Sequence, residues 1–189
     1  MRKKGFTLIE LLISSAVFIL IITLLIGLFA QIFKAQSKVI TSQQLLDQTS
    51  YALEYMGRFL RMAKKSQDGE CLSASGLNYE IFSAGGEPGG GIRFLSSKTK
   101  CQEFFLENGQ IKSRTSWNTS KTGFGSALSL TSDKFLIEPG SLKFAIQGEQ
   151  LGDNLQPRAT IFMEIGRNPD LKPKIQLQTT VSQRNLDIP

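Results

Sequence analysis

The stretch Gly5-Phe6-Thr7-Leu8-Ile9-Glu10-Leu11-Leu12 follows the basic segment Met1-Arg2-Lys3-Lys4 and opens a long apolar run. No charged residue occurs from Leu11 to Phe33, so Glu10 is the only charge inside the run. As a helix, residues 6–33 would extend about 42 Å, whereas about 20 residues suffice to cross the hydrocarbon core of a bilayer. We expect residues 6–33 to be a retained membrane-spanning helix, because the apolar core is too long for a secretory signal.

Glu10 is costly in such a segment, by about 2.5–3.5 kcal/mol at a helix centre and less near an end. No basic residue within the run could neutralise the Glu10 carboxylate, which suggests that its partner is on another molecule. The alternative is a carboxylate that reaches the headgroup region from the first helical turn.

The residues from Gly5 to Leu12, placed behind a short basic leader, resemble the processing site of type IV prepilins and pseudopilins. The resemblance implies a leader of residues 1–5, cleavage by prepilin peptidase between Gly5 and Phe6, and N-methylation of Phe6. It also implies that Glu10 pairs with the terminal amine of a neighbouring subunit in a filament. A wrong axial stagger would leave both charges buried and unpaired, at a cost of about 3–5 kcal/mol, so Glu10 would set the register of assembly.

Two further features of the resemblance concern the kind of subunit. Many major pilins carry a proline about seventeen residues after the glutamate, and this chain has Gly27 at that position. The segment from Thr180 to Asn185 resembles the closing segments of J-type and W-type minor subunits. The chain is therefore most similar to minor pilins and pseudopilins.

The residue inventory gives no support for an enzyme, a metal centre or a cofactor. The chain has 189 residues, a net charge of +6 and no histidine, which removes the commonest general base and metal ligand. Without residues 1–5 the 22 basic residues fall by three to 19, against 16 acidic residues, so half of the excess charge belongs to the leader.

The two cysteines, Cys71 and Cys101, follow the apolar run and are 30 residues apart. A disulfide between them would stabilise the fold by roughly 3–4 kcal/mol on the chain-entropy view. Two buried thiols are the alternative, because spacing alone does not fix the pairing.

An amphipathic continuation of the helix is expected over residues 34–66, with Gly69 as its stop. Leu46, Leu53 and Leu60 lie seven residues apart, and an intervening row at the same spacing gives an apolar stripe. The simplest expectation is one helix of about 60 residues, half in the membrane and half packed by one face on a soluble domain.

Residues 67–189 show short β-type runs separated by turn residues, which predicts a globular β-rich domain. Asn108-Gly109 is a hairpin signal, whereas the glycine-rich residues 84–91 are expected to be a mobile loop. The predicted strands are Leu77–Phe82, Ile92–Leu95, Glu103–Glu107, Gln110–Arg114, Ser126–Thr131, Lys134–Ile137, Leu142–Gln147, Arg158–Ile165 and Lys174–Val181. The expected fold class is α+β and pilin-like, with a long N-terminal helix packed on an antiparallel sheet.

We therefore expect a minor pilin or pseudopilin that works with prepilin peptidase, sibling subunits and membrane lipid in a type IV filament or a type II secretion pseudopilus. Arg2, Lys3 and Lys4 predict a cytoplasmic N-terminus and an extracytoplasmic C-terminal domain. The alternative is a minor pilin of a competence pilus that captures DNA. That role requires basic residues and aromatic rings on one exposed face, and the candidates are Lys100, Lys112, Arg114, Lys121, Trp117 and Phe124.

Overall fold

The computed structural model describes residues 5–149, 155–167 and 173–184. The chain divides into two compact units, residues 1–41 and 42–189. The basic leader residues Met1 to Lys4 lie outside the described residues, as does Asn185 at the end of the segment that resembles minor subunits.

Helix α1 (Leu8–Arg61) runs without a break through the apolar segment and beyond it. Within the first unit every described residue as far as Ile40 is exposed, and Ser14 and Thr23 donate their hydroxyl protons to the carbonyls of Glu10 and Ile19. In the described part of the chain, α1 is the one helix long and apolar enough to cross a membrane.

In the second unit the same helix buries only one side. Its buried residues recur at intervals of three and four, as expected for one face of a helix: Leu45, Thr49, Ala52, Met56 and Leu60. Within the predicted stripe Leu60 is fully buried and Leu53 partly buried, but Leu46 is 44% exposed, because the buried face passes through Leu45 instead.

The helix ends at Arg61, several residues before the predicted stop. Lys64 leaves the helical path to donate its N–H to the carbonyl of Leu95. Tyr79 Oη donates to the carbonyl of Leu60 at 2.7 Å, and Arg184 N–H donates to that of Arg61 at 2.7 Å. The last carbonyls of the helix are thus satisfied by distant segments, which lets the helix stop before Gly69.

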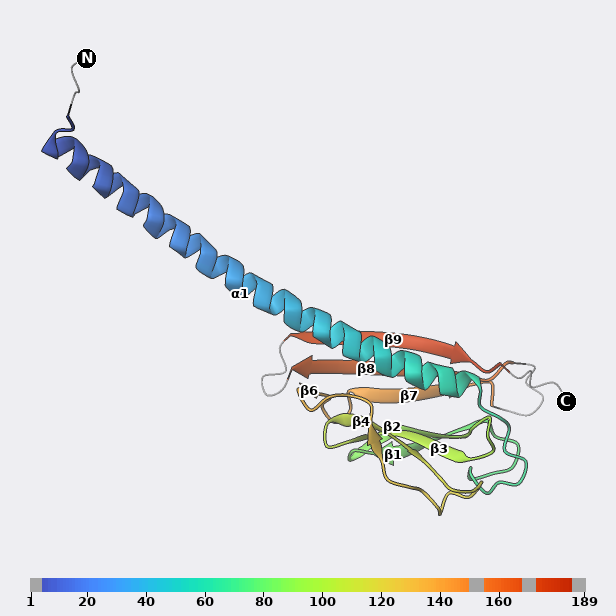
Figure 1. Ribbon diagram of the computed structural model, residues 1–189. Coiled ribbons are helices and arrows are strands. Elements are labelled where there is room, and N and C mark those ends of the chain that lie inside the picture. Colours follow the sequence, from blue (N-terminus) through green and yellow to red (C-terminus); the bar gives the residue numbers. More distant parts are fainter. Residues whose placement is uncertain (1–4, 150–154, 168–172, 185–189) are drawn as a thin grey trace. The chain divides into compact units, whose positions relative to one another are not determined.

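Two antiparallel sheets, rather than the single expected sheet, make up the rest of the second unit. The first has the order β1-β2-β3-β4-β5 and the second contains β6, β7, β8 and β9, with β8 paired to each of the other three. Figure 1 shows β7, β8 and β9 side by side, with β1 to β4 in a separate layer. The strand bounds are β1 Tyr79–Ala84, β2 Glu87–Leu95, β3 Cys101–Glu107, β4 Gln110–Thr115, β5 Leu128–Ser129, β6 Phe135–Leu136, β7 Leu142–Gln147, β8 Arg158–Arg167 and β9 Lys174–Ser182.

One hydrophobic core joins the buried face of the helix to both sheets. Phe104 of β3 makes edge contacts with Tyr55 and Phe59 of α1, with ring centroids 6.0 and 6.3 Å apart. From the second sheet, Ile161 and Ile165 of β8 are fully buried. The expected α+β class, a long N-terminal helix followed by antiparallel strands, is confirmed.

The Asn108-Gly109 hairpin is confirmed. Both residues have positive φ, 52° and 73°, as a two-residue turn of the type favoured by Asn-Gly requires. The turn pairs Glu107 with Gln110 and starts the β3–β4 register.

The glycine-rich segment was wrongly predicted to be a loop, because most of it belongs to β2. Gly91 pairs with Phe82 of β1, and a Cβ on Gly91 would lie 2.5 Å from the Phe82 ring. Only Gly85 and Gly86 form the turn between the two strands. The glycines there make room for a ring that covers the strand, which composition alone does not reveal.

Candidate functional site

The N-terminal end of α1 is organised by Thr7 and Glu10. Glu10 Oε2 accepts hydrogen bonds from the Thr7 backbone N–H at 3.0 Å and from Thr7 Oγ1 at 2.9 Å. Thr7 Oγ1 in turn faces the Glu10 N–H at 3.4 Å. This reciprocal arrangement is a capping box, in which two backbone donors that lack helical partners are satisfied.

The capping box uses one oxygen of the Glu10 carboxylate and leaves the other available. Among the described residues, no group donates to Oε1 of Glu10. Phe6, next to the box, is 84% exposed. The carboxylate is therefore held in a fixed orientation by its own chain while one face stays open to a further donor.

Thr7 is a residue that the sequence reasoning did not single out. The signal was present, because Thr-x-x-Glu ahead of an apolar run is the sequence pattern of a capping box. The glutamate therefore has a local role, capping the helix, in addition to any role between subunits.

Cys71 and Cys101 are joined by a disulfide, with their Cα atoms 5.4 Å apart. Both half-cystines are buried in a small cluster with Leu72 and Leu95, apart from the main core. The bond ties the segment that follows α1 to the start of β3, 30 residues further along the chain.

A row of alternating charges crosses the first sheet through Glu80, Arg93, Glu103 and Arg114, which are paired in register. The Glu103 side chain is fully buried and accepts hydrogen bonds from Arg93 Nε and Arg114 Nε, each at 2.5 Å. This row could not be predicted from local sequence patterns, since its members come from four strands. With both guanidinium groups engaged, the buried carboxylate is compensated and serves as a structural element.

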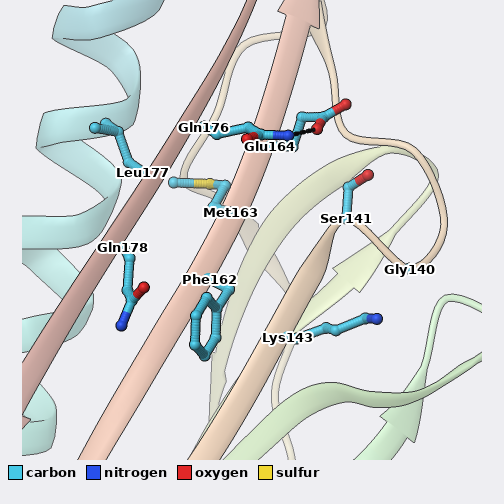
Figure 2. A pocket seen from close by; sticks show the side chains of 9 residues that line it. All are labelled: Gly140, Ser141, Lys143, Phe162, Met163, Glu164, Gln176, Leu177 and Gln178. Carbon is cyan, nitrogen blue, oxygen red and sulfur yellow. Dashed lines mark hydrogen bonds between the residues drawn. The ribbon is translucent and has the colours of Figure 1, made fainter.

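A surface hollow of about 620 Å³ lies on the exposed face of the second sheet. Figure 2 shows Phe162 between Lys143 and Gln178, and Glu164 bonded to Gln176. Hydrogen bonds from Gln176 and from Lys174 hold the pKa of Glu164 below its ordinary value, so this carboxyl stays ionised near neutral pH. The hollow offers an aromatic ring and amides, a combination suited to contact rather than to proton transfer.

The basic residues considered for DNA binding are only partly available. Lys112 pairs with Glu107 at 2.6 Å, and Arg114 pairs with Glu103 while its guanidinium lies 4.7 Å from the centre of the Phe124 ring. Trp117 is 78% exposed, and Lys121 is exposed in the same loop.

No group of three or more metal-ligating side chains was found within residues 5–149, 155–167 and 173–184. Asp153 and Asn154, a pair too small to suggest a calcium loop, lie outside the described residues.

A protein-family model described as a prokaryotic N-terminal methylation motif matches residues 1–27. The match spans the leader, the capping box and most of the apolar segment. It identifies the chain as a type IV pilin-like protein. The motif implies processing by a prepilin peptidase and assembly with other pilin subunits, and the long apolar helix fits the single-pass membrane anchor typical of pilins.

Comparisons with curated proteins and with solved structures gave no match.

Proposed function

We propose that this chain is a minor subunit of a type IV filament or of a type II secretion pseudopilus, with a structural and not a catalytic role. Prepilin peptidase cleaves after Gly5, Phe6 becomes the N-methylated first residue, and the C-terminal unit lies outside the cytoplasmic membrane. The subunit enters the filament when Glu10 receives the terminal amine of a neighbouring subunit.

The observation that carries this proposal is the state of Glu10. It is the only charge between Phe6 and Phe33, and its Oε1 atom has no donor in the described part of the chain. A free α-amine has a reference pKa of about 7.7–8.0 and is mostly protonated at neutral pH. A neighbouring ammonium is a suitable partner, since it supplies both a compensating charge and a donor.

The minor-subunit assignment is supported by the helix around Gly27. No proline interrupts α1, and a Cβ at Gly27 would meet nothing within 4 Å, so neither a kink nor close packing within the chain requires this glycine. Many major pilins differ in carrying a proline at this place.

The test compares Glu10→Gln with the unchanged chain in cells that express the full assembly system. A glutamine can retain the capping box but cannot neutralise an ammonium. We expect leader removal and membrane insertion at normal levels, together with a loss of incorporation of at least about tenfold, because an uncompensated buried charge costs about 3–5 kcal/mol. Immunoblots of sheared filaments and of membranes provide the two readouts.

Thr7→Ala is the matched control, because it removes the cap and keeps the carboxylate. It should lower helix stability by about 0.5–2 kcal/mol and leave most incorporation intact. Normal incorporation of the Glu10→Gln chain would show that the charge pair is not what recruits this subunit. An intact leader on protein isolated from filaments would contradict processing after Gly5.

DNA capture in a competence pilus is the second candidate, and the exposed Trp117 ring favours it. Such a ring, in the same loop as Lys121, could stack on a base while the lysine contacts a phosphate. Binding of single-stranded DNA should then weaken with added salt and fall on Trp117→Ala. Salt-independent or undetectable binding would exclude this role.

A further inference from the structure

Strand β9 forms one edge of the second sheet. It pairs with β8 over nine consecutive positions, from Arg158–Ser182 to Gly166–Lys174, without a shift in register. Among the described strands, none pairs with the opposite side of β9. Of the strands with a single described neighbour, β9 is the longest.

The register shows which backbone groups point away from β8. Gln183 N–H donates to the carbonyl of Pro157, so the odd-numbered residues of β9 face β8. In an antiparallel pair the direction alternates, and the N–H and C=O groups of Gln176, Gln178 and Thr180 therefore point outward. These groups form an open hydrogen-bonding edge.

This edge lacks the features that usually protect an exposed strand. Bulges, prolines and charged side chains blunt most natural edges. Residues 174–182 contain no proline, their pairing has no bulge, and Lys174 at the start is their only charge. An unprotected edge of nine residues is a template for pairing with another chain.

A groove of about 530 Å³ lies between this strand and α1. Its apolar lining includes Leu53 of the helix and Leu177 and Val181 of the strand. Gly57 lets the helix approach the strand closely beside the groove, since a Cβ there would lie 3.3 Å from Val181 Cγ2. An added strand, about 4.8 Å from β9, could bury alternate side chains in this groove.

Arginines gather at the end of the groove where β9 ends. Arg58 pairs with Glu54 at 3.3 Å. The backbone bond from Arg184 to Arg61 brings the other two together, and neither of their guanidinium groups forms an ion pair with any described residue. This end of the groove therefore favours a carboxylate.

We propose that β9 and this groove bind an extended segment of another protein, which joins the sheet as an antiparallel strand. The segment alternates apolar and polar residues, and its N-terminal end is acidic so that it meets Arg61 and Arg184. A second copy of β9 fits less well, because residues 174–182 contain no carboxylate. This inference does not depend on the charge pair at Glu10.

The test uses the full chain in detergent micelles and a fluorescein-labelled, amidated peptide of sequence EEVTVTVTV. Fluorescence anisotropy should report binding of this peptide and weaker binding of two matched peptides, KKVTVTVTV and VTVTVTVEE. Changing both Arg61→Ala and Arg184→Ala should weaken binding of the acidic peptide on the order of tenfold. Equal affinity for all three peptides would overturn the proposed orientation and charge preference.

The backbone edge is tested separately with Gln178→Pro and its control Gln178→Ala. The proline removes an outward N–H and no bond to β8, so an edge strand tolerates it. Binding should be lost in the first variant and kept in the second. Binding that persists in a folded Gln178→Pro chain would overturn strand addition.

Hydrogen exchange on the unchanged chain gives a readout that requires no variant to fold. The bound peptide should slow exchange at the amides of Gln176, Gln178 and Thr180, while the odd-numbered residues are already protected. The absence of added protection at these three amides would overturn the proposal. Binding of oligothymidine by a chain that binds none of the peptides would also overturn it. Concentration-dependent dimers that compete with the peptide would instead identify a second copy as the occupant and overturn it as well.

Discussion

The two parts of helix α1 use leucine in opposite ways. From Leu11 to Phe33 the helix carries no charge on any side and its residues are exposed, with Leu24 at 63%. After Thr41 the exposed faces become polar and one stripe is fully buried, with Leu60 at 0%. An all-round apolar helix suits lipid or the centre of a bundle, whereas a one-sided helix suits a protein core facing water.

The difference shows that hydrophobicity alone does not specify packing. The first part can satisfy its side chains only with lipid or with other subunits, and its serine and threonine hydroxyls return to backbone carbonyls. The second part is satisfied by the two sheets of its own chain. A single helix thus carries an intermolecular surface and an intramolecular surface in succession.

The sharpest comparison is one substitution made in both parts. Leu60→Ala should lower the free energy of unfolding of the second unit by about 2–5 kcal/mol, because it leaves a cavity in a closed core. Leu24→Ala should change it by less than about 0.5 kcal/mol. Thermal unfolding in micelles, followed by near-ultraviolet circular dichroism, measures both, and equal effects would show that the two surfaces do not differ in this way.

Loss of the disulfide should affect only the second unit. Replacing Cys71 and Cys101 together by serine frees a loop of 30 residues and should cost roughly 3–4 kcal/mol of unfolding free energy. Membrane insertion should stay unchanged, as judged by extraction at alkaline pH. A double variant as stable as the parent would mean that the surrounding cluster holds the loop without the bond.

A lysine should be harmful in the first part of the helix and tolerated on the exposed side of the second part. Leu24→Lys should disfavour membrane insertion by about 2.5–3.5 kcal/mol, because the ammonium would lie in hydrocarbon. Leu46→Lys, on the exposed side of the second part, should insert normally. The measurement is the membrane-integrated fraction of each chain, and impaired insertion of the Leu46→Lys chain would move the membrane boundary toward the second unit.

The smallest effect concerns the end of the helix. Tyr79→Phe removes the hydrogen bond to Leu60 and should cost about 1 kcal/mol at neutral pH. Burial raises the pKa of Tyr79, so the neutral phenol is favoured in the folded state. Its contribution is complete below about pH 10, the usual tyrosine pKa, and declines as the pH rises further, since the unfolded chain ionises first.

The phenylalanine variant should therefore lose less stability than the parent between neutral pH and alkaline pH above about 10. Burial also raises the pKa of Tyr55. Part of the loss of stability at alkaline pH should therefore occur in both proteins. Parallel stability curves for the two proteins would contradict this account of Tyr79.

Local patterns predicted most of this fold. Alternation located the strands to within a few residues, and the hairpin followed from Asn108 and Gly109. The predictions were wrong or incomplete where the local structure depends on residues that are distant in the sequence. The end of the helix depends on Leu95 and Arg184, the place of Gly91 in a strand depends on the Phe82 ring, and the burial of Glu103 depends on arginines from two neighbouring strands.

The candidate sites likewise divide into those formed by adjacent residues and those formed by residues distant in the sequence. The motif around Gly5, Phe6 and Glu10 was readable because its residues are adjacent, and the Thr7 cap was readable from the same stretch. The groove beside β9 could not be predicted in this way, since its lining residues come from α1 and from the last strand, more than 100 residues apart in the sequence.

The bonds at the end of α1 also order events during synthesis. Gln183 Nε2 donates to the carbonyl of Ala63, which the ribosome made 120 residues earlier. Arg184 closes the last turn in the same way. The second unit therefore completes these contacts only after nearly all of its chain has been translated. The apolar part of α1, made first, has no such dependence on the last residues of the chain, so it is available to the bilayer before the second unit is fully folded.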